Sequence, residues 1–173
     1  PEYRGSIGYG RTFYDAIDYG GAEVDDVVTA VSVLRNQYPD VAPDQIGIIG
    51  WSHGGLIALL SIFRYPTAFR AAAALEPVTN LFHRLARKGV EQQRRAIDPQ
   101  NRFGGGPSER PDVYRYRSPL FHVDDLRIPL WMAKGLWDIG NIGPLSNVFA
   151  EAYWNPGDWR PVKVGYLPRP WGL

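Results

Sequence analysis

Apolar residues recur along the chain in two periods, one typical of helices and one typical of buried strands. From Gly21 onward, valines and leucines three or four residues apart form one face of an amphipathic helix that ends before Pro39. Residues 46–50 are apolar on both faces, as expected for a strand in the middle of a parallel sheet. Residues 54–64 are apolar on nearly all sides, which predicts a buried helix.

The second half of the chain continues this alternation. Residues 71–75 are compatible with a helix by propensity, but a short strand is expected, because they follow the predicted helix and precede the sequence Glu-Pro-Val. Residues 79–118 lose the periodicity and contain three consecutive glycines, which indicates an irregular insertion with one or two helices. Further strands are expected at 130–133 and 162–167, and residues 145–154 are compatible with a helix.

Helices that alternate with strands over this length predict an α/β fold, with a mainly parallel sheet and helices on both of its faces. A chain of 173 residues can bury one core, so we expect a single domain. The sequence begins at Pro1, with no helix or strand signal before Tyr3. We therefore expect the chain to begin inside a domain and to be a fragment of it.

Composition narrows the classes of partner. A net charge of +1 provides no field for a polyanion, so we expect no nucleic-acid partner. No run reaches the roughly 18 apolar residues of a membrane span, so no membrane partner is expected. The absence of cysteine excludes disulfides and thiol chemistry, and it leaves the compartment and the oligomeric state open.

A G-x-S-x-G motif stands between the predicted strand and the predicted buried helix, as Gly50-Trp-Ser-His-Gly54. In that context the motif is typical of a nucleophile elbow, in which a serine on a strained turn points its hydroxyl away from the sheet. A Cβ at Gly50 or Gly54 is expected to crowd this turn. We predict Ser52 as the nucleophile and the backbone N–H of His53 as an oxyanion donor. A plain turn is the alternative.

Several segments together resemble the catalytic domain of the prolyl oligopeptidase family of α/β-hydrolases, in particular its dipeptidyl- and acylaminoacyl-peptidase-like members. They are YRGSIGYG at 3–10, DYGG at 18–21, EVDD at 23–26, PDQIG at 43–47 and GWSHGG at 50–55. The resemblance extends over about residues 3–130. It implies a serine peptidase that acts on a peptide or acyl-ester substrate, with the triad in the order Ser, Asp, His and without cofactor or metal.

The same resemblance implies further site residues. It places the triad acid at Asp138, in the loop after the strand near Pro129, where KGLWD stands in place of the family's H-G-x-x-D. Val78 and Leu81 match a part of the family that lines the substrate pocket. As apolar residues early in a loop, they are equally compatible with packing in the core.

The general base has no evident candidate. In this fold the catalytic histidine follows the last strand, and no histidine follows Leu167. Each of the three histidines, His53, His83 and His122, has another explanation from its place in the chain. We therefore expect this chain by itself to assemble no complete triad and to have little hydrolase activity. No two histidines share a helix face at metal-ligand spacing, so a metal site is not expected.

Two alternatives to a peptidase follow from the same residues. The elbow does not encode the substrate, so a carboxylesterase or an esterase similar to dienelactone hydrolase has the same signature. A fragment or pseudoenzyme that keeps the sheet without catalysis is the second alternative.

Overall fold

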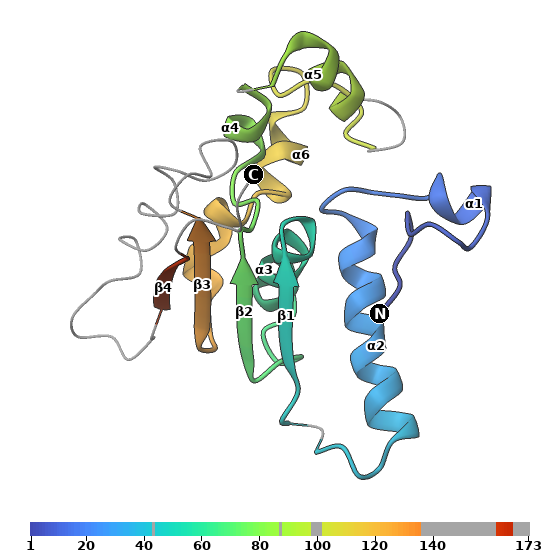
Figure 1. The fold of residues 1–173 in the computed structure, drawn as a ribbon, viewed down its shortest axis with the longest axis vertical. Helices are drawn as coiled ribbons and strands as arrows, with labels where there is room; N and C mark the ends of the chain where they lie inside the picture. The colour runs from blue at the N-terminus through green and yellow to red at the C-terminus, as the bar shows by residue number, and fades with distance from the viewer. Residues whose placement is uncertain (43, 87, 98–101, 136–161, 168–173) are drawn as a thin grey trace.

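The computed structural model describes residues 1–42, 44–86, 88–97, 102–135 and 162–167 (Figure 1). In chain order the elements are α1 (Arg11–Tyr14), α2 (Ala22–Gln37), β1 (Gly47–Trp51), α3 (His53–Arg64), β2 (Ala71–Leu75), α4 (Leu81–Ala86), α5 (Val90–Ile97), α6 (Pro111–Tyr116), the 3-10 helix η2 (Pro119–Asp125), β3 (Leu130–Gly135) and β4 (Val162–Leu167). The helix predicted at 145–154 and the predicted acid Asp138 lie outside the described residues.

The described strands form one four-stranded sheet in the order β1-β2-β3-β4, and all three pairs are parallel. Trp51 pairs with Leu75, and Leu75 pairs with Ala133, so the carboxyl ends of β1 and β2 are level at one edge of the sheet. This arrangement confirms the strands predicted at 71–75, 130–133 and 162–167 and the parallel character of the sheet.

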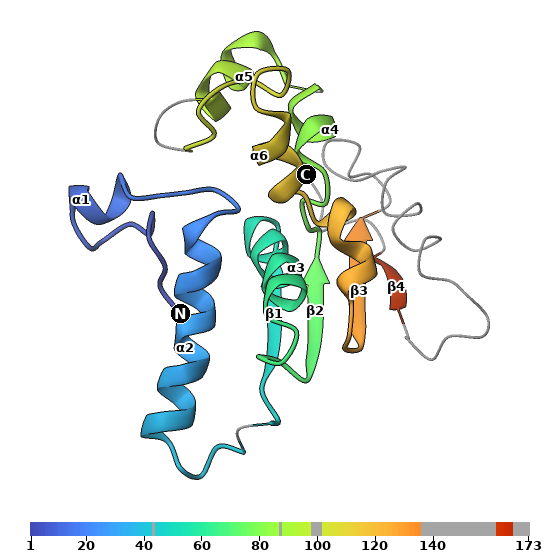
Figure 2. The ribbon, with the colours of Figure 1, turned by 180° about the vertical axis from the view of Figure 1, so that it is seen from behind.

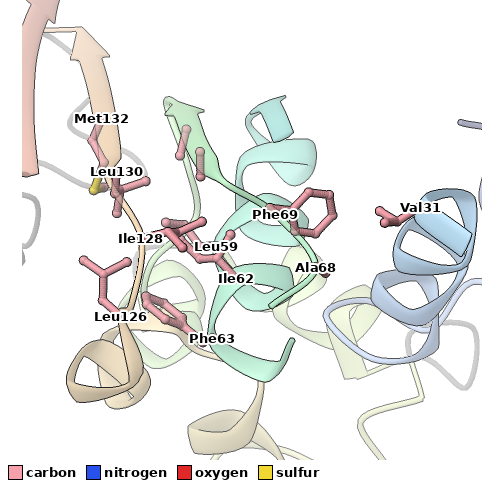
Figure 3. Close-up of a cluster of buried hydrophobic side chains, with 12 residues drawn as sticks. Val31, Leu59, Ile62, Phe63, Ala68, Phe69, Leu126, Ile128, Leu130 and Met132 are labelled. Carbon is pink, nitrogen blue, oxygen red and sulfur yellow. The ribbon is translucent and has the colours of Figure 1, made fainter. Parts of the chain in front are cut away.

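Helix α3 is the central helix of the described structure, and it packs against β1, β2, α2 and η2. All residues from Gly55 to Phe63 are buried, which confirms the predicted buried helix. Figure 3 shows how Leu59, Ile62 and Phe63 of α3 meet Leu130 and Met132 of β3 and Leu126 of the preceding segment. Val31 brings α2 into the same cluster.

The prediction that residues 46–50 lie at the centre of the sheet is wrong within the described residues, where β1 is an edge strand. Ile48 is half-buried against the α3 cluster, whereas Ile49 and Trp51 on the other face are 73% and 71% exposed. Helix α3, which packs on β1 and β2, therefore covers one face of these strands (Figure 2). A strand that is apolar on both sides does not by itself reveal its position in a sheet.

Helix α2 spans the residues predicted from the 3.6-residue period, with Val24 and Val31 buried. Two aspartates near its start bind neighbouring segments. Asp26 accepts hydrogen bonds at 2.7 and 2.6 Å from the guanidinium of Arg4, and Asp25 accepts one at 2.5 Å from the hydroxyl of Tyr65. The N-terminal segment and the end of α3 are thus both tied to α2.

The described part of residues 79–118 contains three helices, α4, α5 and α6, where one or two were predicted. In both views these helices lie beyond the carboxyl ends of the strands (Figures 1 and 2). Leu85, Phe103 and Tyr114 of this region share a buried cluster with Leu56 and Leu60 of α3. The region is therefore packed onto the nucleophile helix, while its bounds as an insertion in a single domain stay a prediction.

Candidate active site

Ser52 stands on the turn between β1 and α3 with φ 53° and ψ −111°. This conformation is costly for a residue with a Cβ, on the order of 1–3 kcal/mol, and persists only where the surroundings enforce it. The Ser52 N–H donates to the Leu75 carbonyl at 2.8 Å, and the Ser52 carbonyl accepts from the Leu56 N–H at 3.1 Å. The residue is exposed, so the strand, strained turn and helix predicted for the elbow are confirmed.

The glycines around Ser52 have different roles from those predicted. A Cβ at Gly50 would lie 2.0 Å from the carbonyl oxygen of Gly54, so glycine is required there, as expected. At Gly54 a Cβ would meet no atom within 4 Å, and the predicted crowding is wrong. The third glycine, Gly55, is constrained as Gly50 is, because its Cβ would lie 2.9 Å from Pro77 Cα in the segment after β2.

The first turn of α3 begins immediately after Ser52. Ser52 is the N-cap and makes no side-chain capping hydrogen bond, and His53 is the first helical residue. The N–H groups of a first helical turn have no partner within the helix, and the positive end of the helix dipole lies beside them. The backbone N–H of His53 therefore has the surroundings of an oxyanion donor, and this role stays a prediction.

The imidazole of His53 is held by three side chains that the sequence did not single out. Nε2 lies 2.9 Å from Oε1 of Glu23, a carboxylate with no exposed surface. The ring stacks on Tyr19 at a centroid distance of 4.2 Å and an interplanar angle of 9°, and Tyr3 meets it edge-on at 5.7 Å. Burial raises the pKa of both tyrosines, so both phenols remain protonated near neutral pH.

The other two histidines also have local surroundings. His122 Nε2 contacts the carbonyl of Tyr116 at 2.8 Å. His83 lies in α4, and its backbone N–H donates to the Asn80 side chain at 3.2 Å. In the part of the chain that the structure describes, no hydrogen bond joins any of the three histidines to the Ser52 hydroxyl. Asp138 and its separation from Ser52 stay predictions.

Val78 and Leu81 are buried in the cluster between α3 and the region after β2, with 0% and 2% of their surface exposed. Packing in the core, one of the two roles expected for these residues, accounts for their burial. A role in the substrate pocket stays a prediction.

No group of three or more histidine, aspartate and glutamate side chains is placed to hold a metal ion in the described ranges. None of the helices described has the length and apolarity needed to cross a membrane.

A family model supplies the decisive comparison. The model of the prolyl oligopeptidase family matches residues 1–141. The chain belongs to this family. The match covers the elbow, the region after β2 and Asp138, and it confirms the resemblance seen in the motifs.

Individual members are similar over parts of this chain. It is 40% identical over 78 residues to dipeptidyl peptidase 8 of Mus musculus, with 44% of this chain and 9% of that protein covered. It is 37% identical over 144 residues to the acylamino-acid-releasing enzyme of Homo sapiens, with 79% and 19% covered. The chain thus spans about a tenth to a fifth of the length of these relatives.

Solved structures of the family share the fold. A puromycin-hydrolyzing peptidase of Mycobacterium tuberculosis superposes with a TM-score of 0.81 at 25% identity, over 96% of this chain and 25% of that chain. This similarity confirms the predicted α/β-hydrolase fold.

Proposed function

We propose that this chain carries the nucleophile of a serine hydrolase that cleaves peptide or acyl-peptide bonds. The observation that supports this most directly is the conformation of Ser52, an exposed serine with φ 53° at the carboxyl end of β1 and the amino end of α3. Strain of this kind persists where function requires it. Membership of the prolyl oligopeptidase family supports the same reaction class.

The chemistry follows from the placement of Ser52. Its Oγ attacks the substrate carbonyl, its proton passes to a general base, and the negative charge on the carbonyl oxygen is stabilised by the His53 N–H. The leaving amine departs with a proton, and water then hydrolyses the acyl ester on Ser52. A general base, together with Asp138 as the triad acid, completes the proposed mechanism.

The substrate class is proposed from the names of the relatives. An acylamino-acid-releasing enzyme, a dipeptidyl peptidase and a puromycin-hydrolyzing peptidase support amide bonds near the end of a short peptide. An esterase on the same fold is the rival outcome of the test.

The test is modification of Ser52 by a fluorophosphonate, located by peptide mapping after prolonged exposure of the folded chain. We expect the label on Ser52, none in Ser52→Ala, and unchanged labelling in Ser32→Ala, a control at an exposed serine of α2. Turnover of a peptide p-nitroanilide and a p-nitrophenyl ester then separates the classes. An intact fold without label on Ser52 would refute the proposal, and ester turnover alone would favour the esterase.

A further inference from the structure

We propose that Glu23 is a positioning residue for the candidate oxyanion donor, because it fixes the imidazole of His53 and thereby the peptide bond between Ser52 and His53. This inference rests on the proposed function of Ser52. Glu23 lies in the first turn of α2, thirty residues before His53 in the chain, yet its Oε1 is 2.9 Å from His53 Nε2.

Burial makes Glu23 unusual among the acidic residues described. Its side chain has no exposed surface, and its Oε1 accepts a second hydrogen bond from the Gly20 N–H at 2.6 Å. A buried carboxylate costs free energy unless it is well paired, and replacement by an apolar side chain is often neutral or stabilising. The groups that pair with this buried carboxylate are the Gly20 N–H and the imidazole of His53.

The bond between the two side chains has a defined direction. An ionised carboxylate has only acceptor oxygens, so a hydrogen bond between Oε1 of Glu23 and His53 requires the hydrogen on Nε2. The ring is therefore a donor to Glu23, and its plane is set by the stacked Tyr19 and the edge of Tyr3.

The support beneath the imidazole is itself anchored. The carbonyl of Tyr19 accepts from Arg117 at 3.0 Å, and the carbonyl of Gly20 accepts from Arg64 at 2.9 Å. These bonds join the loop before α2 to the end of α3 and to the end of α6. The imidazole thus contacts a surface that cannot shift without breaking several hydrogen bonds.

A fixed side chain at position 53 constrains the backbone where the chemistry is proposed. The His53 N–H is part of the peptide whose orientation is set by ψ of Ser52, −111°. As the first helical residue, His53 has no intrahelical partner to hold that N–H. The carbonyl of the same peptide accepts from the Leu56 N–H at 3.1 Å, and the His53 side chain is its second anchor. A displacement of about 1 Å in a positioned group costs about 100-fold in rate.

The experiment compares rates of phosphonylation of Ser52, in which the reagent's phosphoryl oxygen occupies the place of the oxyanion. Glu23→Leu is expected to slow the chemical step about 10- to 100-fold, with the reagent's binding constant unchanged. Glu23→Gln keeps an oxygen at the Oε1 position and is expected to restore most of the rate. His53→Phe, which keeps the stack on Tyr19 and loses the bond to Glu23, tests the same link if Glu23→Leu does not fold.

Asp26→Asn is the matched control, because Asp26 lies one turn further along α2 and pairs with Arg4 instead of the elbow. It is expected to lower stability and to leave the rate within about 2-fold. Equal rates in wild type and Glu23→Leu, or an equal loss in Asp26→Asn, would overturn the proposal.

A second readout does not depend on reactivity. In NMR spectra the amide signal of His53 should move in Glu23→Leu and stay in place in Asp26→Asn. If wild-type Ser52 takes no label, the proposed function fails, and this signal alone decides the positioning role: an unchanged signal in Glu23→Leu would overturn it.

Discussion

Single residues around Ser52 show what the motif encodes and what it leaves open. The sequence predicted a serine on a strained turn, and the φ of 53° agrees with it. It did not reveal which of the glycines is constrained by neighbours, because a close approach to the segment after β2 depends on how strand and helix pack. The partner of His53 was equally hidden, since Glu23 is thirty residues away and in another helix.

Substitution of the glycines by alanine should separate these roles. In Gly50→Ala a Cβ meets backbone at 2.0 Å, so we expect a loss of roughly 3 kcal/mol or more in the free energy of unfolding. In Gly55→Ala the contact with Pro77 is less severe, at 2.9 Å, and a loss of about 1–3 kcal/mol is expected.

Gly54→Ala is the control for both, because a Cβ there meets nothing within 4 Å. Alanine in a helix is expected to leave stability unchanged or to raise it by up to about 1 kcal/mol. Denaturant unfolding of the three variants measures the order, and a Gly54→Ala variant less stable than Gly55→Ala would contradict it.

At the scale of elements, the periodicity placed α2, β1, α3 and β4 correctly because each has a strong local pattern, whereas β2 was predicted from its place in the chain. It failed for the position of β1 in the sheet, which is decided by pairing between distant segments. It also undercounted the helices after β2, since α4 and α6 are six residues each and too short for a period to be visible.

The ion pair between Arg4 and Asp26 is a testable link between the N-terminal segment and α2. Hydrogen bonds from the Arg4 side chain lower the pKa of Asp26 below its ordinary value. A carboxyl with a lowered pKa in the folded state stabilises the fold above its unfolded pKa, and this contribution disappears as the pH falls through the folded pKa. The pair is partly exposed, so Asp26→Asn should cost roughly 0.5–1 kcal/mol at neutral pH.

The difference in Tm between wild type and Asp26→Asn should therefore be largest above pH 5 and shrink below about pH 4. Thermal unfolding followed by circular dichroism between pH 3 and 7 measures it. Asp44→Asn, at an exposed position after α2, is the control and should show no such dependence. A difference that stays constant to pH 3 would show that the charge of Asp26 is not what holds the N-terminal segment.

For the whole molecule, the described structure joins a four-stranded parallel sheet to a helical region at its carboxyl edge. Helices α4–α6 lie beyond the carboxyl end of β1 (Figure 1), and Ser52 directly follows this strand in the chain. The shared cluster with α3 makes this region part of the support of the elbow. The family was predictable from short motifs, whereas the triad acid at Asp138 is a prediction that these residues leave untested.

The last prediction concerns the reactivity of this chain by itself. His53 is bound to Glu23, His122 contacts the Tyr116 carbonyl, and His83 lies in α4, so none is placed to take the proton of Ser52 in the described structure. Loss of a triad base typically lowers the rate by about 10⁴- to 10⁶-fold. We therefore expect fluorophosphonate labelling of residues 1–173 to be at least about 10³-fold slower than that of a family member with a complete triad.

The measurement is the second-order rate constant of labelling for wild type, His83→Gln and His122→Gln, with Ser52→Ala as the blank. If no histidine serves as base, both substitutions leave the slow rate within about 2-fold. Rapid and stoichiometric labelling of wild type would contradict the prediction, and the histidine whose removal abolishes it would be the base. For His53 the rate of His53→Phe is compared with that of Glu23→Leu. Loss of a general base at position 53 would lower the rate well beyond the 10- to 100-fold expected from misplacement of the oxyanion donor alone.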